Sequence, residues 1–239
     1  MTFTSLDLGR YVSCIAVFAV LMVLLVPAEA QEPQEPKVDA AIVLAIDCSF
    51  SVDANEFKQQ MQGLGQAFLR PEIKKAIRNG AHGQIAVAAI HWSDDVNQAV
   101  IVPWRIIASD ADADALGTLL ENTPRRIAAG GTSISMALQY SANLLKEAPR
   151  AERLIVDVSS DGRNNIGPPV KPIRDQIVAK GTTINAVVIL NEWPTLDKYF
   201  EENVVGGQGN FVIPADDYSA YAEGIYKKLL REITGPGIS

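Results

Sequence analysis

Oxygen-bearing side chains follow a short apolar segment in the first quarter of the chain. Residues 41–46 are six consecutive apolar residues. They are too few for a typical helix and have no polar face, so they predict a strand buried on both sides. Asp47, Ser49 and Ser51 then place one carboxylate and two hydroxyls on alternate positions directly after this strand. Oxygen ligands at the carboxyl end of a parallel strand indicate a site for a hard cation such as Mg²⁺.

Two later stretches carry similar chemistry. Thr132 follows two glycines just before an expected helix, and Asp161 stands in a Ser-Asp-Gly sequence after an expected buried strand at 154–158. Each stretch alone could have a structural role instead of binding metal, because short polar residues commonly cap helices and form turns. Their joint occurrence favours a metal site.

The order Asp-x-Ser-x-Ser, Gly-Gly-Thr and Ser-Asp-Gly resembles the metal-ion-dependent adhesion site of von Willebrand factor type A domains. The resemblance covers residues 38–234 and extends to a group of secreted bacterial proteins with an A-like domain, which implies a fold but no activity. It implies that three hydroxyls bind the cation directly, and that two carboxylates act directly or through water. The expected metal-site residues are Asp47, Ser49, Ser51, Thr132 and Asp161. The expected ion is Mg²⁺, with Mn²⁺ or Ca²⁺ as alternatives.

Strands alternate with helices along the rest of the chain, which predicts a doubly wound, mostly parallel six-stranded sheet with helices on both faces. Expected strands are 41–46, 84–92, 98–104, 154–158, 184–190 and 209–213, and expected helices begin near residues 53, 71, 109, 133, 170 and 218. The second and third strands form an edge hairpin, since Pro103 gives no ladder donor. In the order 3-2-1-4-5-6, Asp47 and Asp161 end neighbouring strands and flank one crevice.

The first thirty residues are typical of a secretory leader. Sixteen uncharged, mostly apolar residues follow Arg10, and Ala28-Glu29-Ala30 is a small-x-small cleavage pattern. An uncleaved membrane anchor is the alternative, although the apolar run is shorter than the ~20 residues that a spanning helix needs. We therefore expect a signal peptide at 1–30, a short polar tether at 31–37, one A-like domain at 38–234 and a C-terminal tail at 235–239. The expected location is periplasmic or secreted, after cleavage near Ala30.

Composition narrows the class of protein further. The net charge of −7 argues against a nucleic-acid-binding protein, which would need a basic face. Of the two cysteines, Cys14 lies in the predicted leader, so Cys48 has no partner for an intramolecular disulfide and is expected to pack in the core.

Three functions are compatible with these patterns. The first is a binding module that holds an Asp or Glu carboxylate of a protein partner through the bound cation. The second is a metal-assisted hydrolase that uses the same ion, and the third is a metal-free scaffold for envelope assembly. The sequence has neither Gly-x-Ser-x-Gly nor His-Glu-x-x-His, and His82 and His91 are its only histidines. We therefore expect a binding module and no enzyme, although His91 ends a predicted strand beside the crevice.

Several charged or polar residues have both an ordinary and a site-related interpretation. Asp110, Asp112 and Asp114 are either a solvated helix start or part of a calcium site, and the first is expected because the stretch lacks the central Gly and closing Glu of a calcium loop. Arg125 and Arg126 are either surface charges or part of the site's edge. The same alternatives, turn chemistry or the edge of the site, apply to Asp94, Asn164 and Asn165.

Overall fold

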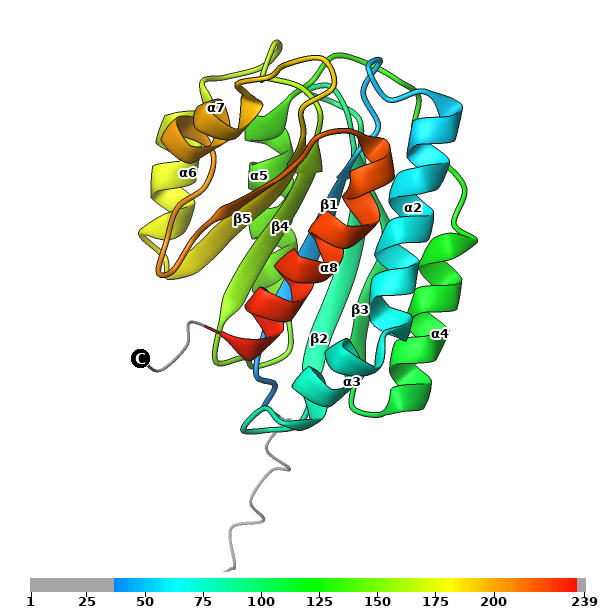
Figure 1. The fold of residues 1–239 in the computed structure, drawn as a ribbon. Helices are drawn as coiled ribbons and strands as arrows, with labels where there is room; N and C mark the ends of the chain where they lie inside the picture. Colours follow the sequence, from blue (N-terminus) through cyan, green and yellow to red (C-terminus); the bar gives the residue numbers. More distant parts are fainter. Residues whose placement is uncertain (1–36, 236–239) are drawn as a thin grey trace, which may run out of the picture. The chain divides into compact units, whose positions relative to one another are not determined.

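The computed structural model describes residues 37–235, so the predicted signal peptide lies outside the described residues. Within this part of the chain, one six-stranded sheet has the order β3-β2-β1-β4-β5-β6 (Figure 1). The strands are β1 (Ala41–Asp47), β2 (Ile85–Trp92), β3 (Gln98–Ile107), β4 (Leu154–Ser160), β5 (Thr182–Ile189) and β6 (Val212–Ala215). Only β2 and β3 pair antiparallel, and the other neighbours are parallel. The predicted fold class, strand order and edge hairpin are confirmed.

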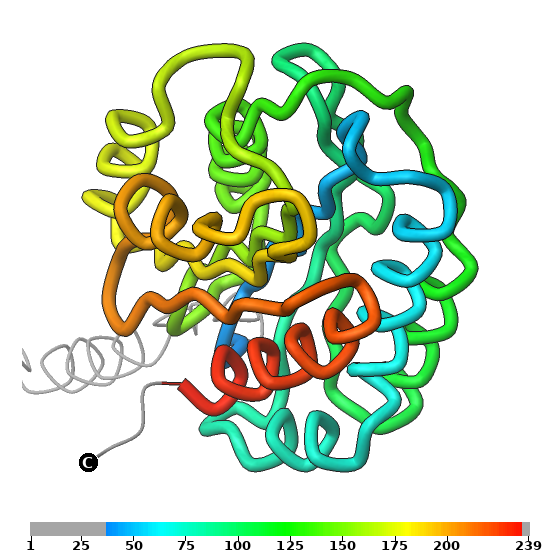
Figure 2. The backbone as a smooth tube through the Cα atoms, turned by 45° about the horizontal axis from the view of Figure 1, so that its top comes forward, coloured from blue at the N-terminus to red at the C-terminus, as the bar shows by residue number. Residues whose placement is uncertain are grey.

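Seven α-helices of the described chain cover the two faces of the sheet (Figures 1 and 2). They are α2 (Ala54–Leu69), α3 (Pro71–Arg78), α4 (Asp110–Glu121), α5 (Ile134–Leu144), α6 (Val170–Val178), α7 (Leu196–Asn203) and α8 (Tyr218–Thr234). Apolar residues of α2, α3, α4 and α8 form one core cluster, and those of α5, α6 and α7 form the other.

The central strand β1 supplies both cores. Ile42 and Leu44 point to the α2–α8 face, whereas Ala41 and Val43 point to the α5–α6 face. Side chains alternate between the two faces of a strand, so a strand covered on both sides needs an unbroken apolar run. That requirement explains the apolar segment that precedes Asp47.

Most strand boundaries lie within two residues of the prediction, and two differ from it by three residues. Strand β3 continues past Pro103 to Ile107. The pairing with β2 shifts register at this point, since Val87 pairs with Arg105 and Ala89 pairs with Val102. A residue at such a bulge is outside the regular ladder, so the N–H that proline lacks is not needed there. Strand β6 begins at Val212 rather than near residue 209, because Gly209 has a left-handed φ of 67°.

The acidic start of α4 is a helix terminus tied to its neighbour. Asp112 and the N-cap Ser109 form a capping box, while Asp110 pairs with Arg78 and Asp114 with Lys74 of α3. These contacts agree with the solvated helix start that we expect there. Among residues 37–235, no helix has the length and apolarity to cross a membrane.

Candidate metal centre

Asp47 and Asp161 come together at the carboxyl ends of neighbouring strands. Asp47 is the last residue of β1, Asp161 follows the last residue of β4, and the two strands pair directly. Both carboxylates are fully buried, with 0% of either residue exposed. Parallel neighbours at the point where the chain direction reverses bring their following loops to one crevice, which explains the encounter of residues 114 positions apart.

The hydroxyls of the β1–α2 loop connect this pair. Ser49 Oγ lies 3.1 Å from Ser51 Oγ, and Ser51 Oγ donates to Asp161 Oδ1 at 2.6 Å. Neighbouring ligands of an octahedral Mg²⁺ lie about 3.0 Å apart, given Mg–O distances of about 2.1 Å. The oxygen chemistry and the spacing of these side chains therefore fit a small hard cation.

Thr132 reaches the same place from the loop before α5. Its backbone N–H donates to Asn165 Oδ1 at 2.8 Å, and its residue is 4% exposed. A Cβ atom on Gly162 would lie 3.4 Å from Thr132 Oγ1, so no side chain separates the threonine from the Asp161 loop. Asn164 Oδ1 similarly accepts a hydrogen bond from Ser135 N. The two asparagines thus bind the β4–α6 loop to the threonine loop, which is more than local turn chemistry.

Asp47 is held by hydrogen bonds on both of its oxygens. Ser49 N donates to Oδ1 at 2.7 Å, and Ser160 Oγ donates to Oδ2 at 2.5 Å. Burial, together with the charge of Asp161, raises the pKa of Asp47 to about 7 despite these bonds. Two acidic groups are therefore enclosed with little solvent to screen them.

Two residues of this network are absent from the sequence prediction. Ser160 holds Asp47, and Tyr218 at the start of α8 donates its hydroxyl to Asp161 Oδ2 at 2.9 Å. Ser160 stands directly before Asp161 in a run of polar residues, so its position was a usable signal. Tyr218 is 57 residues farther along the chain and fits an apolar helical face, so only the packing of α8 reveals its role.

The charge of the pair has no cationic partner in the described chain. No Lys or Arg between residues 37 and 235 forms an ion pair with Asp47 or Asp161. Residues 37–235 also contain no group of three or more His, Cys, Asp or Glu side chains that could hold a metal ion. Any metal bound here would therefore depend on hydroxyls in addition to the two carboxylates.

A pocket of about 380 Å³ opens over these loops. Its lining residues are Phe50, Ser51, Gly130, Gly131, Thr132, Gly162, Arg163, Asn165, Glu192 and Trp193. It thus includes two of the five predicted metal-site residues, with Asp47, Ser49 and Asp161 buried beneath the surface.

The neighbouring histidine and cysteine have packing roles. His91 is fully buried, meets Phe57 edge-on with ring centres 5.2 Å apart, and its pKa is lowered to about 4 by burial and by Arg125 and Arg126. Arg125 itself donates to Val52 O at 2.7 Å and lies over the Phe57 ring. Cys48 is buried in the α2–α8 core cluster, as expected.

Solved structures with this architecture define the class of fold. A von Willebrand factor type A protein from Catenulispora acidiphila has a TM-score of 0.56 and 18% identity over 84% of this chain and 44% of that one. Proximal thread matrix protein 1 from the mussel byssus, in a structure with a zinc-occupied MIDAS motif, gives 0.57 and 19% over 84% and 50%. The chain therefore has the fold of a von Willebrand factor type A domain and spans about half the length of these two proteins.

A third solved structure is matched over almost its whole length. The vWF domain of the type V pili tip protein Mfa5 from Porphyromonas gingivalis has a TM-score of 0.56 and 10% identity, over 84% of this chain and 98% of that one. No curated protein sequence matches the chain. The chain belongs to the family described as "Protein of unknown function (DUF1194)", whose model matches residues 37–237.

Proposed function

We propose that this protein is a secreted or periplasmic binding module that engages an acidic group of a protein partner through a divalent cation. The observation that carries the proposal is the buried pair Asp47 and Asp161. This pair accepts hydrogen bonds from three hydroxyls, those of Ser51, Ser160 and Tyr218, and has no Lys or Arg partner within residues 37–235. Enclosed carboxylates without a counterion are costly. A bound cation would offset that cost.

Each predicted residue has a distinct task in this proposal. Ser49, Ser51 and Thr132 would hold the cation through their hydroxyls, while Asp161 and Asp47 would supply charge directly or through water. Mg²⁺ is the proposed ion, with Mn²⁺ or Ca²⁺ as alternatives. When bound, the cation supplies a positive centre whose remaining coordination position attracts an outside carboxylate. Because only two of the five ligands are charged, the site keeps an attraction for an acidic partner.

The comparisons support a binding role. One protein of the same fold carries zinc in a MIDAS motif, and another is a pilus tip protein. Within the described chain, the enclosed position of His91 against Phe57 gives it no access to the pocket as a base. Binding therefore accounts for the site better than hydrolysis does.

The location and domain limits complete the proposal. We propose a signal peptide at 1–30, a tether at 31–37 and a binding domain at 38–234, followed by the tail at 235–239. An intact mass that begins at Gln31 would support the leader, whereas a mass that includes residues 1–30 together with membrane association would reverse the location.

Metal-dependent capture tests the proposed function. Immobilised parent protein and a Thr132→Ala variant are exposed to an envelope extract in Mg²⁺ or in EDTA. Proteins retained by the parent only in Mg²⁺ are expected, and purified partner should bind the variant at least about tenfold more weakly, which corresponds to ~1.4 kcal/mol. Capture that is indifferent to both EDTA and Thr132 would leave the fold standing and remove the cation from the mechanism.

A further inference from the structure

Exposed apolar side chains gather at one edge of the molecule. The large apolar residues that are exposed in the described chain are Phe50 (78%), Val96 (79%), Val100 (38%), Ile166 (38%) and Trp193 (46%). Four of these lie in loops that follow the carboxyl ends of β1, β2, β4 and β5. Single exposed apolar residues are ordinary, but four on the loops of one sheet edge need an explanation.

Three of these four residues lie close to the candidate metal centre. Phe50 stands between Ser49 and Ser51 in sequence, and both Phe50 and Trp193 line the 380 Å³ pocket. Ile166 lies against the glycine loop before Thr132, since a Cβ atom on Gly131 would come within 3.0 Å of its Cγ2. We call Phe50, Ile166 and Trp193 the apolar rim.

A basic side chain joins this surface. Arg163 lines the same pocket, its guanidinium lies 5.2 Å from the Trp193 ring centre, and its Nη2 donates to Thr195 Oγ1 at 2.9 Å. No carboxylate of residues 37–235 forms an ion pair with it. The whole chain carries a net charge of −7, so Arg163 is a local positive charge on an otherwise acidic protein. It favours an acidic group at short range.

We propose that the occupant of this surface is a protein segment in which an Asp or Glu stands within a few residues of a large apolar side chain. The inference rests on the proposed function, because the acidic group is the one that engages the cation. The apolar side chain packs between Phe50 and Trp193, and Arg163 contacts the same carboxylate or a second one. Aromatic and arginine side chains in a pocket are the residues that most often dominate binding energy at protein interfaces. The rim would therefore set which acidic segments bind.

A displayed library of random heptapeptides tests this inference without a known partner. The library is selected on the full chain in Mg²⁺ and eluted with EDTA. We expect the eluted peptides to contain an acidic residue with Phe, Trp, Leu or Ile within three positions. Synthetic copies of these peptides should bind Phe50→Ser and Trp193→Ser about tenfold more weakly than the parent. Val100→Ser, which changes an exposed apolar residue outside the pocket, should bind like the parent.

The outcomes separate the rim from the cation. Acidic peptides without an apolar preference, whose binding is unchanged by Phe50→Ser and Trp193→Ser, would overturn the rim and leave the proposed function intact. Peptides that EDTA does not elute, or a selection that enriches none, would contradict the proposed function and the rim together. Magnesium affinity measured on Phe50→Ser checks that the exposed substitution has left the metal centre unchanged.

Discussion

Two clusters of buried carboxylates occupy this sheet, and they are neutralised differently. At the carboxyl edge, Asp47 and Asp161 are surrounded by hydroxyls. In the other cluster, Asp157 and Glu232 enclose Lys228, whose Nζ lies 2.5 Å from Asp157 Oδ2 and 2.7 Å from Glu232 Oε1. All five residues are at least 98% buried. Within residues 37–235, the chain supplies a Lys to one cluster and no Lys or Arg to the other.

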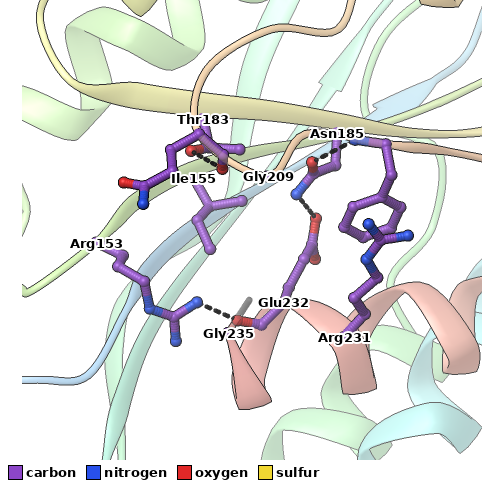
Figure 3. A pocket seen from close by; sticks show the side chains of 10 residues that line it. Arg153, Ile155, Thr183, Asn185, Gly209, Arg231, Glu232 and Gly235 are labelled. Atoms are coloured by element: carbon purple, nitrogen blue, oxygen red, sulfur yellow. Dashed lines mark hydrogen bonds between the residues drawn. The ribbon is translucent and has the colours of Figure 1, made fainter. Parts of the chain in front are cut away.

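The internally neutralised cluster lies beside a pocket of about 260 Å³ between α8 and the amino ends of β4 and β5 (Figure 3). There Asn185 Nδ2 donates to Glu232 Oε1 at 2.8 Å, and Arg153 Nη2 donates to Ile233 O at 3.0 Å at the end of α8. These polar groups are thus paired within the protein, whereas Glu232 Oε2 has no hydrogen-bond partner within residues 37–235. We therefore infer that the internally neutralised cluster stabilises the fold, and we propose that Asp47 and Asp161 bind an external cation.

Removal of the internal cation should have the largest effect. Lys228→Met leaves Asp157 and Glu232 buried together without a counterion, so we expect a loss of about 3–5 kcal/mol in the free energy of unfolding. Urea unfolding measures it. Lys227→Met is the matched control, because its side chain is 61% exposed and its loss should cost less than ~0.5 kcal/mol. A similarly small effect of both variants would contradict the claim that Lys228 neutralises this cluster.

The carboxyl-edge cluster should instead respond to an added cation. Magnesium at a hundred times its dissociation constant should raise the free energy of unfolding of the parent by about 2.7 kcal/mol, because it binds only the folded state. Asp161→Asn should abolish this increase, since it removes half of the negative charge of the pair. Urea midpoints with Mg²⁺ and with EDTA measure the effect, and an equal increase in the variant would place the ion elsewhere.

The free energy of unfolding should depend on pH through Glu232 of the internally neutralised cluster. Burial and the charge of Asp157 raise the pKa of Glu232 from 4.5 to about 8, against the opposing effect of Lys228. The folded protein therefore holds the proton of the Glu232 carboxyl group more tightly than the unfolded chain does. The stability that this proton contributes is complete below pH 4.5 and is lost as pH rises through 8. In EDTA, Glu232→Gln should flatten the decline in stability by up to about 1.4 kcal/mol per pH unit. Parallel pH profiles of parent and variant would contradict this assignment.

The smallest expected effect is at Asn165, which positions Thr132. Asn165→Ala removes the acceptor of the Thr132 backbone N–H, a loss of about 1 kcal/mol. If the threonine hydroxyl holds the cation, Mg²⁺ affinity should fall roughly fivefold. Calorimetric titration measures it, with Asn210→Ala as a control in an exposed loop. Unchanged affinity would remove Thr132 from the metal centre.

Sequence patterns predicted the sheet order and the convergence of the carboxyl-edge loops for physical reasons. The apolar run before Asp47 specifies a strand buried on both faces, and the alternation of strands and helices fixes which strand ends are neighbours. The proximity of Thr132 to Gly162, in the loop that contains Asp161, follows from the same topology. Whether these residues bind a metal stays a prediction.

The internally neutralised cluster could not be predicted in this way. Asp157 lies within an apolar strand, and Lys228 and Glu232 lie on α8 more than 70 residues later. Only the packing of α8 on β4 and β5 shows that the three charges meet. The same limit applies to Tyr218 and to the apolar rim, because loop side chains converge through tertiary structure rather than through periodicity.

Calorimetric titration of Mg²⁺ into metal-free protein tests the contrast between the two clusters most directly. The parent and Glu232→Gln, which alters the internally neutralised cluster, should each bind one ion with similar affinity. Asp47→Asn, which alters the carboxyl-edge cluster by a matched change, should fold and bind none. Equal affinity in all three proteins, or no binding by the parent, would contradict the claim that Asp47 and Asp161 are arranged for an external cation.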